Sequence, residues 1–323
     1  MDVMLSRRDL IRAAAGAAAA LTLPSPLIAC GLSRPVNPDQ ERLAAWAAVL
    51  RSENLATSSV PLGRSAARVG ELAAGTPYEA FTLEAYLRAG GNPSRPEPLA
   101  LSLTRFDCVT LVEACIAVAR VGADSRTPVW KRFGREVERM RYRGGKRRGY
   151  TSRLHYFSEW ISDGAARGLV RDLGAELGGE EDARPLRFMS EHRKSYPALA
   201  HEGVFREIGA MERRLDGRAR WVVPVARIPA VVHELESGDV LAFATAIPGL
   251  DVSHAAFAYR DRGDVLRVLH APLSGGVVEV TRSTLPEYVA AIPRCTGILA
   301  ARPLGRGSRQ ARSMSTAIPR HFP

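Results

Sequence analysis

Residues 105–115 read RFDCVTLVEAC, and this stretch carries the pattern that decides the fold. From Cys108 onward, apolar side chains recur at intervals of three and four residues, which is typical of a helix packed along one side. Val109, Ile116 and Val118 extend the apolar face toward complete burial. The stretch therefore predicts a core helix that begins at Cys108.

The residues before this helix indicate that its first residue is chemically active. Asp107 is a favourable N-cap, and Phe106 can pack as a hydrophobic staple. Cys108 would then lie at the helix N-terminus, where unpaired N–H groups and the helix dipole favour an anion. We expect this position to lower the pKa of the Cys108 thiol, and the same N–H groups to stabilise an oxyanion. The alternative is a small core cysteine, the interpretation that we keep for Cys115.

The N-terminal residues predict export by the twin-arginine route. Residues 6–10 read SRRDL, and an uncharged, alanine-rich stretch follows at residues 13–20. Residues 27–30 read LIAC, which resembles a lipobox in which Cys30 becomes the mature N-terminus and carries the lipid. An ordinary cleaved signal peptide is the alternative. We therefore expect a periplasmic lipoprotein held on a membrane through Cys30, and no other stretch is long and apolar enough to cross a bilayer.

The remaining chain is long enough for one large domain. The tail is basic and rich in glycine and serine, so we expect it to be disordered. We assign residues 1–29 to the signal peptide, residues 30–38 to the anchor and a linker, residues 39–302 to the folded domain and residues 303–323 to the tail.

The charge of the chain points to an anionic partner. Its formal net charge is +11, which in an exported protein favours the cell wall or phospholipid headgroups over nucleic acid. Between residues 131 and 153, basic side chains are interleaved with aromatic ones, and we leave open whether they bind an anion or form a solvated helix face. The basic residues are Lys131, Arg132, Arg135, Arg139, Arg141, Arg143, Lys146, Arg147, Arg148 and Arg153.

The C-terminal part of the chain changes to a strand pattern. Apolar runs predict strands at residues 240–245, 252–260 and 265–270. Residues 261–263 read DRG, and a three-residue loop with a left-handed glycine is a common hairpin connection. If Arg260 pairs with Asp264, His254 lies directly opposite His270 on the same sheet face.

The two histidines predict a base and the residue that orients it. Directly opposed side chains have Cβ atoms about 4.5 to 5.5 Å apart, which lets one imidazole hydrogen-bond the other. His254 would then accept the proton of Cys108, while His270 holds the tautomer of His254. A metal site that uses both histidines is the alternative, although the spacing identifies no third ligand, and no cysteine spacing suggests structural zinc.

Four further features predict local structure. Thr76, Pro77 and Glu79 together predict a helix start with a capping box. Glu113 lies about 140° around the helix from Cys108, so we expect it to form a buried ion pair with Arg153 rather than to act on the thiol. A helix is also expected at residues 40–51. Cys115 and Cys295 either form a disulfide or remain buried thiols.

Taken in order, the motifs resemble the N-acetylmuramoyl-L-alanine amidase-like branch of the NlpC-type, papain-like cell-wall hydrolases. The resemblance covers about residues 70 to 302. It implies an α+β, papain-like (NlpC-type) core, with the nucleophile helix packed on an antiparallel sheet and with extra helices. The matching motifs are Gly75-x-Pro77-Tyr78, Phe106-Asp107-Cys108-x-Thr110-x-x-Glu113, Ser152-Arg153-Leu154-His155-Tyr156, Gly238-Asp239-Val240, Val252-Ser253-His254, Leu269-His270-Ala271 and Thr296-Gly297-Ile298.

The resemblance also implies roles for individual residues. It makes Cys108 the nucleophile, His254 the base and His270 the third catalytic member. We also expect oxyanion or supporting roles for Tyr78, Asp107 and Ser253, and substrate contacts at Arg153 and Tyr156.

By the same resemblance, the protein hydrolyses the amide bond between N-acetylmuramic acid and L-alanine in peptidoglycan or muropeptides, with no cofactor or metal. One alternative is a stem-peptide endopeptidase that cuts between D-glutamate and the diamino acid. Another is a non-catalytic, wall-binding lipoprotein.

Overall fold

The helix predicted from residues 105–115 is α4, Cys108–Gly122, in a computed structural model that describes residues 37–124, 129–218, 220–273 and 276–305. Asp107 is its N-cap: the side chain accepts a hydrogen bond from the Thr110 N–H at 2.7 Å, while Thr110 Oγ1 accepts one from the Asp107 N–H at 2.8 Å. Every residue from Leu111 to Gly122 is buried. The prediction of a core helix beginning at Cys108 is confirmed.

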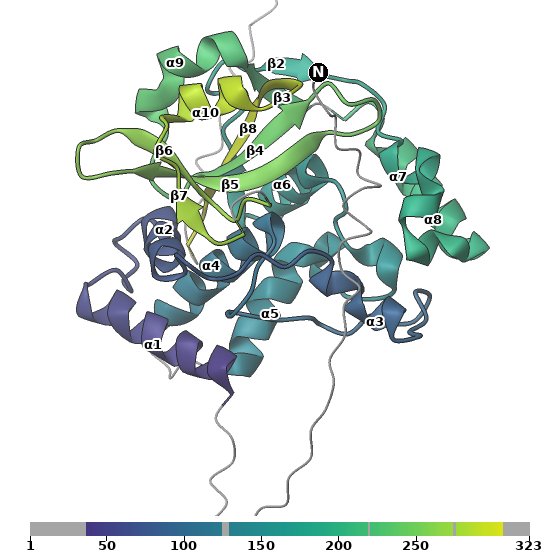
Figure 1. The fold of residues 1–323 in the computed structure, drawn as a ribbon, viewed down its shortest axis with the longest axis horizontal. Coiled ribbons are helices and arrows are strands. Elements are labelled where there is room, and N and C mark those ends of the chain that lie inside the picture. The colour runs from purple at the N-terminus through teal and green to yellow at the C-terminus, as the bar shows by residue number, and fades with distance from the viewer. Residues whose placement is uncertain (1–36, 125–128, 219, 274–275, 306–323) are drawn as a thin grey trace, which may run out of the picture. The chain divides into compact units, whose positions relative to one another are not determined.

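The other helices surround α4 and the sheet (Figure 1). The predicted helix at residues 40–51 is confirmed as α1, and its apolar face, which includes Trp46 and Leu50, is buried. The helices besides α4 are α1 Pro38–Ser52, α2 Leu62–Leu72, α3 Ala85–Arg88, α5 Trp130–Arg141, α6 Phe157–Ala166, α7 Phe188–Glu191, α8 Glu202–Leu215, α9 Ile228–Val231 and α10 Leu285–Ala291.

The described strands form one sheet in the order β2-β3-β8-β4-β5-β6-β7, with β1 also paired to β8. Every pairing is antiparallel, so the molecule is an α+β protein with an antiparallel sheet and many helices. The strands are β1 Val170–Asp172, β2 Glu180–Asp182, β3 Arg220–Pro224, β4 Val240–Thr245, β5 Val252–Arg260, β6 Leu266–His270, β7 Glu279–Val280 and β8 Cys295–Pro303.

The sheet is covered on both faces, and β4 is accordingly buried at every position and apolar from Val240 to Ala244. Alternate residues of β4 point to opposite sides, as the two-residue period of a strand requires. Ala242 and Ala244 pack in the cluster that contains α1, α2, α4 and α5. Leu241 and Phe243 pack in the cluster that contains α9 and α10. Figure 1 shows these two helical groups on either side of the sheet.

The predicted register of the β5–β6 hairpin is wrong by two residues. Arg260 pairs with Leu266 and not with Asp264. The turn is longer because the left-handed residue is Asp264, at φ 60°, and because the Asp261 side chain accepts hydrogen bonds from the N–H groups of Gly263 and Val265. A shift of two residues keeps every side chain on its face, so His254 and His270 remain on the same side of the sheet.

The predicted helix start at Thr76 is also wrong. Residues 77 and 78 are extended and bridge Val277 and Phe106. The Tyr78 N–H donates to Gly276 O at 2.8 Å, and Pro77 O accepts from the Phe106 N–H at 3.0 Å. These tertiary bonds use the backbone groups that a helix would need, so the helical turns begin only at Thr82.

The ion pair predicted between Glu113 and Arg153 does not form. Glu113 pairs with Arg141 instead, with 2.7 Å between Oε2 and Nε, and both side chains are buried. Arg153 pairs with Glu84 and Glu97. Which arginine pairs with Glu113 depends on how α4 packs against α5. The sequence pattern of α4 alone cannot predict this packing.

Candidate active site

Cys108 lies at the first position of α4, against strand β5. Its thiol faces the backbone N–H groups of Ala255, Val109 and Cys108, all of which favour the thiolate. Burial, and then the Asp107 carboxylate, act more strongly in the opposite direction and raise the pKa of the Cys108 thiol to about 12. The prediction of a lowered pKa is therefore wrong, because a neighbouring strand removes the thiol from water.

His254 and His270 are in direct contact. His254 Nε2 lies 2.8 Å from His270 Nδ1, and the two rings meet edge to face at 75°. A β-bulge in β5 lies next to this contact. Phe243 of β4 opposes His254 and Ala244 opposes Val252, which leaves Ser253 unpaired. Such a bulge re-aims the neighbouring side chain. The structure thus brings together the two histidines, and the Cys108 thiol meets the backbone N–H of Ala255, the residue that follows His254.

Both histidines are neutral near pH 7. Burial, and secondly the positive charge that His270 would carry when protonated, lower the pKa of His254 to about 3. Burial lowers the pKa of His270 to about 4. Since His254 Nε2 is engaged with His270, only Nδ1 of His254 is left to accept a proton. This requires that His254 Nε2–H donates to His270 Nδ1, and that His270 carries its own proton on Nε2.

Two residues that the sequence analysis missed complete the surroundings of His270. The Tyr288 hydroxyl lies 3.2 Å from His270 Nδ1, and Tyr288 also interacts electrostatically with Cys108. Glu279 is the cross-strand partner of His270, and its Oε1 lies 3.8 Å from His270 Nε2. A signal for Tyr288 existed, because Thr284 and Glu287 form a capping box that marks the start of α10.

Replacing Tyr288 with phenylalanine tests its role. The Tyr288 hydroxyl donates to His270 Nδ1, where it shares the single lone pair with His254 Nε2–H, and loss of one neutral hydrogen bond corresponds to about two- to tenfold in rate. We expect kcat to fall by that factor with KM unchanged, because Tyr288 acts through His270. Tyr259→Phe is the matched control, since it removes a hydroxyl bonded to Glu71 away from the histidines. Equal activity in both variants would exclude the role.

The other predicted site residues separate into two groups. Tyr78 lies beside the start of α4 through its bridge to Phe106, and Asp107 caps the helix. Ser253 is exposed in the bulge. Arg153 and Tyr156 are buried, and Tyr156 donates to Glu212 at 2.6 Å. Their burial gives these two side chains a structural role and argues against contact with substrate.

The remaining cysteines do not join the site. Cys115 and Cys295 are free, so the disulfide alternative is not realised. Cys30 lies outside the described residues. Within those residues, no three or more histidine, cysteine or acidic side chains are grouped to hold a metal ion. No helix in the described ranges is long and apolar enough to span a membrane.

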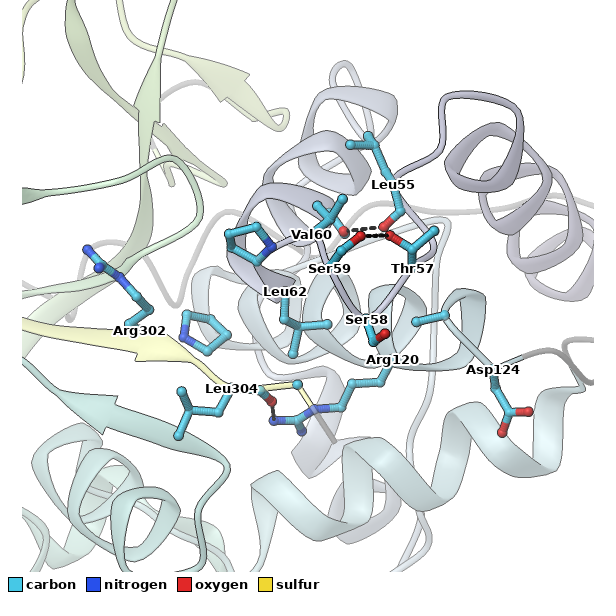
Figure 2. Close-up of a pocket in the computed structure, with 15 residues that line it drawn as sticks. Leu55, Thr57, Ser58, Ser59, Val60, Leu62, Arg120, Asp124, Arg302 and Leu304 are labelled. Carbon is cyan, nitrogen blue, oxygen red and sulfur yellow. Dashed lines mark hydrogen bonds between the residues drawn. The ribbon is translucent and has the colours of Figure 1, made fainter. Parts of the chain in front are cut away.

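A cavity of about 410 Å³ lies at the other end of α4 (Figure 2). Its charged groups already have partners: Arg120 donates to Leu169 O at 2.8 Å, and Asp124 pairs with Arg132 at 2.9 Å. Arg302, on another wall, pairs with Asp239. With its charges engaged inside the protein, this cavity offers no group for the chemistry at Cys108.

Comparison with known proteins identifies the class to which this fold and site belong. Residues 68–298 match the AmiA-like, N-acetylmuramoyl-L-alanine amidase-like family model. The chain belongs to this family, and it is accordingly an enzyme of the amidase-like hydrolase class. A search of curated proteins found no match.

Similar solved structures include an amidase and a protein with a different description. An N-acetylmuramoyl-L-alanine amidase from Bacteroides uniformis is 30% identical with a TM-score of 0.68, over 75% of this chain and 99% of that one. A Bacteroides fragilis protein described as a candidate xylanase is 32% identical with a TM-score of 0.65, over 72% and 99%. A Legionella pneumophila protein shares only the fold, at 17% identity and a TM-score of 0.60, over 82% and 94%.

Proposed function

We propose that the protein is a cysteine-dependent amidase with a papain-like, NlpC-type core that cleaves the N-acetylmuramic acid to L-alanine bond of peptidoglycan or muropeptides. The observation that carries this proposal is the contact between His254 and His270 beside the thiol of Cys108. A nucleophile, a base and a residue that orients the base are the parts that acyl transfer requires. Family membership and the B. uniformis amidase support the choice of substrate.

The mechanism follows from the neutral resting state. As the Cys108 sulfur attacks the lactyl carbonyl carbon, its proton passes to His254 Nδ1, and His270 stabilises the imidazolium by accepting from Nε2–H. The backbone N–H groups at the start of α4 hydrogen-bond the tetrahedral oxyanion. His254 then protonates the departing L-alanine nitrogen, which leaves a thioester on Cys108. Water, deprotonated by His254, hydrolyses the thioester and restores the thiol.

The neutral base predicts a particular pH dependence. Only neutral His254 can accept the thiol proton, and its pKa of about 3 lies well below the ordinary value of about 6.5. His270, with a pKa of about 4, must also be neutral to accept from His254. We therefore expect kcat/KM to remain constant as the pH falls through 6.5. It should decline only near the pKa values of the two histidines, at about pH 3 to 4. An acid limb of kcat/KM centred at about pH 6.5 would contradict the burial of the pair.

Mass spectrometry of defined muropeptides tests the proposal directly. Wild-type protein should release the free stem peptide, Cys108→Ala should not, and a chelator should have no effect. Cleavage inside the stem would select the endopeptidase, whereas dependence on added metal would select the metal site. No turnover by either protein would favour a wall-binding role. Hydrolysis of xylan would require a pair of carboxylates flanking the bond, so we include xylan as a negative control.

We further propose that residues 1–29 direct twin-arginine export and that Cys30 carries a lipid in the periplasm. These residues lie outside the described part of the chain, so the proposal depends on the SRRDL and LIAC motifs. The mass of the N-terminal peptide from membrane-extracted protein tests it, since a diacylated Cys30 is expected. An unmodified N-terminus would overturn the anchor while leaving the catalytic proposal intact.

A further inference from the structure

The basic residues between positions 131 and 153 are divided by the structure into two groups. Most of them are engaged in ion pairs inside the protein and contribute to the fold. The pairs are Arg132 with Asp124, Arg139 with Glu136, Arg141 with Glu113, Arg143 with Glu159, Arg147 with Glu138, and Arg153 with Glu84 and Glu97. The rest are Lys131 and Arg135 on α5, and Lys146 and Arg148 on the following loop.

The loop that carries Lys146 and Arg148 is held in place. The Arg148 N–H donates to Ser152 Oγ at 2.9 Å, and Arg148 O accepts from the Glu97 N–H at 3.0 Å. A Cβ added at Gly149 would lie 2.8 Å from the carbonyl oxygen of Pro93. The backbone at Gly149 therefore packs so closely on the backbone at Pro93 that a residue with a side chain would not fit. Both cationic side chains are exposed, and they make no ion pair or hydrogen bond with the described residues.

A groove of about 690 Å³ separates this loop from α8. Lys146 and Arg148 line it on the loop side, and the exposed Arg214 lines it from α8. The acidic side chain in its wall, Glu207, accepts a hydrogen bond from Thr151 Oγ1 at 2.6 Å. Arg143, which also lines the groove, is neutralised by Glu159. Three cations from two separate elements thus face one groove without ion-pair partners among the described residues. They outnumber the one acidic group in its wall that is not ion-paired, the Glu207 carboxylate, whose charge the hydrogen bond from Thr151 leaves in place.

We propose that this groove binds a linear polyanion whose charged groups are oxyanions. Guanidinium groups match phosphate and carboxylate oxygens in a bidentate manner, and an ammonium binds them as a point charge. The volume of about 690 Å³ exceeds that of a single small anion, so the groove has room for several linked oxyanions. A bilayer surface cannot enter a groove between a loop and a helix, so a strand is the better occupant than a lipid headgroup layer. This site is separate from Cys108 and does not depend on the proposed reaction.

Titration with short-chain polyphosphate and with poly-L-glutamate, each at several salt concentrations, tests the groove. The test variant is Lys146→Ala with Arg148→Ala and Arg214→Ala. The control variant is Arg51→Ala with Arg262→Ala and Arg282→Ala, which removes the same charge from exposed positions elsewhere. Urea unfolding of both variants checks that they are folded.

We expect the groove variant to bind about tenfold or more weakly, and the slope of log K against log salt to become shallower by about 2, since each contact contributes about 0.7. The control variant should bind like wild type, and Cys108→Ala should bind fully. The polymer that binds more tightly identifies the oxyanion as phosphate or carboxylate. Equal losses in both triple variants, no binding of either polymer, or binding only to vesicles of phosphatidylglycerol would overturn the proposal.

Discussion

Cys108→Ala is expected to abolish amide hydrolysis while leaving the fold intact. Loss of a nucleophile that acts together with a base lowers kcat on the order of 10⁴- to 10⁶-fold, because the alternative attack by water lacks the covalent path. The substitution removes only one half-buried sulfur atom, so the free energy of unfolding should change little. Steady-state kinetics on a defined muropeptide, together with urea unfolding, measure the two effects.

Cys115→Ala is the matched control for this prediction. Cys115 lies on the same helix, two turns beyond Cys108, and is fully buried in the core. We expect it to keep its activity and to lose about 1 kcal/mol of stability through the small cavity that it leaves. Retained activity in Cys108→Ala would remove Cys108 from the mechanism.

Arg141→Met is expected to destabilise the protein by about 3 to 5 kcal/mol. Glu113 is buried on α4, and Arg141 supplies the charge that compensates it at 2.7 Å. Removing Arg141 leaves an uncompensated carboxylate in the core. The resulting loss in the free energy of unfolding is far larger than the net stabilisation that the intact pair provides. The shift in the urea midpoint, at an unchanged denaturant slope, measures the loss.

An exposed ion pair provides the comparison. Arg105 and Glu79 lie 3.2 Å apart at the surface, and Arg105→Met should cost less than about 1 kcal/mol. The double variant Glu113→Leu with Arg141→Met should recover much of the stability, because two apolar side chains need no compensation. A loss for Arg141→Met no larger than that for Arg105→Met would contradict the assignment of a buried pair.

Local signals in the sequence were sufficient for α4 and for the strands of the hairpin. Asp107 caps α4 through residues next to it in the chain, and the apolar runs of β4 and β5 reflect burial from both sides. The register of the hairpin depended on one backbone angle at Asp264, which the DRG sequence does not reveal. The predicted direct opposition of the two histidines was therefore wrong, but they still lie on one face and in contact, because the error was an even number of residues.

Tertiary contacts decided the features that the sequence could not predict. Thr76 has the residues of a helix start around it, but strand-like bonds to Phe106 and to residues 276–278 keep that segment extended. The thiol of Cys108 has the local setting that lowers a pKa, yet its burial against β5 reverses the direction. Tyr288 reaches His270 from a helix that no motif joined to the site.

Detection of an acyl-enzyme on Cys108 tests the central claim most directly. Protein mixed with a muropeptide is quenched in acid during turnover, and its intact mass and peptide map are recorded. We predict a thioester between Cys108 and the lactyl group of N-acetylmuramic acid, present in wild type and absent in Cys108→Ala. Turnover without any adduct on Cys108, even when rapid quenching captures the burst phase, would contradict nucleophilic catalysis by this residue.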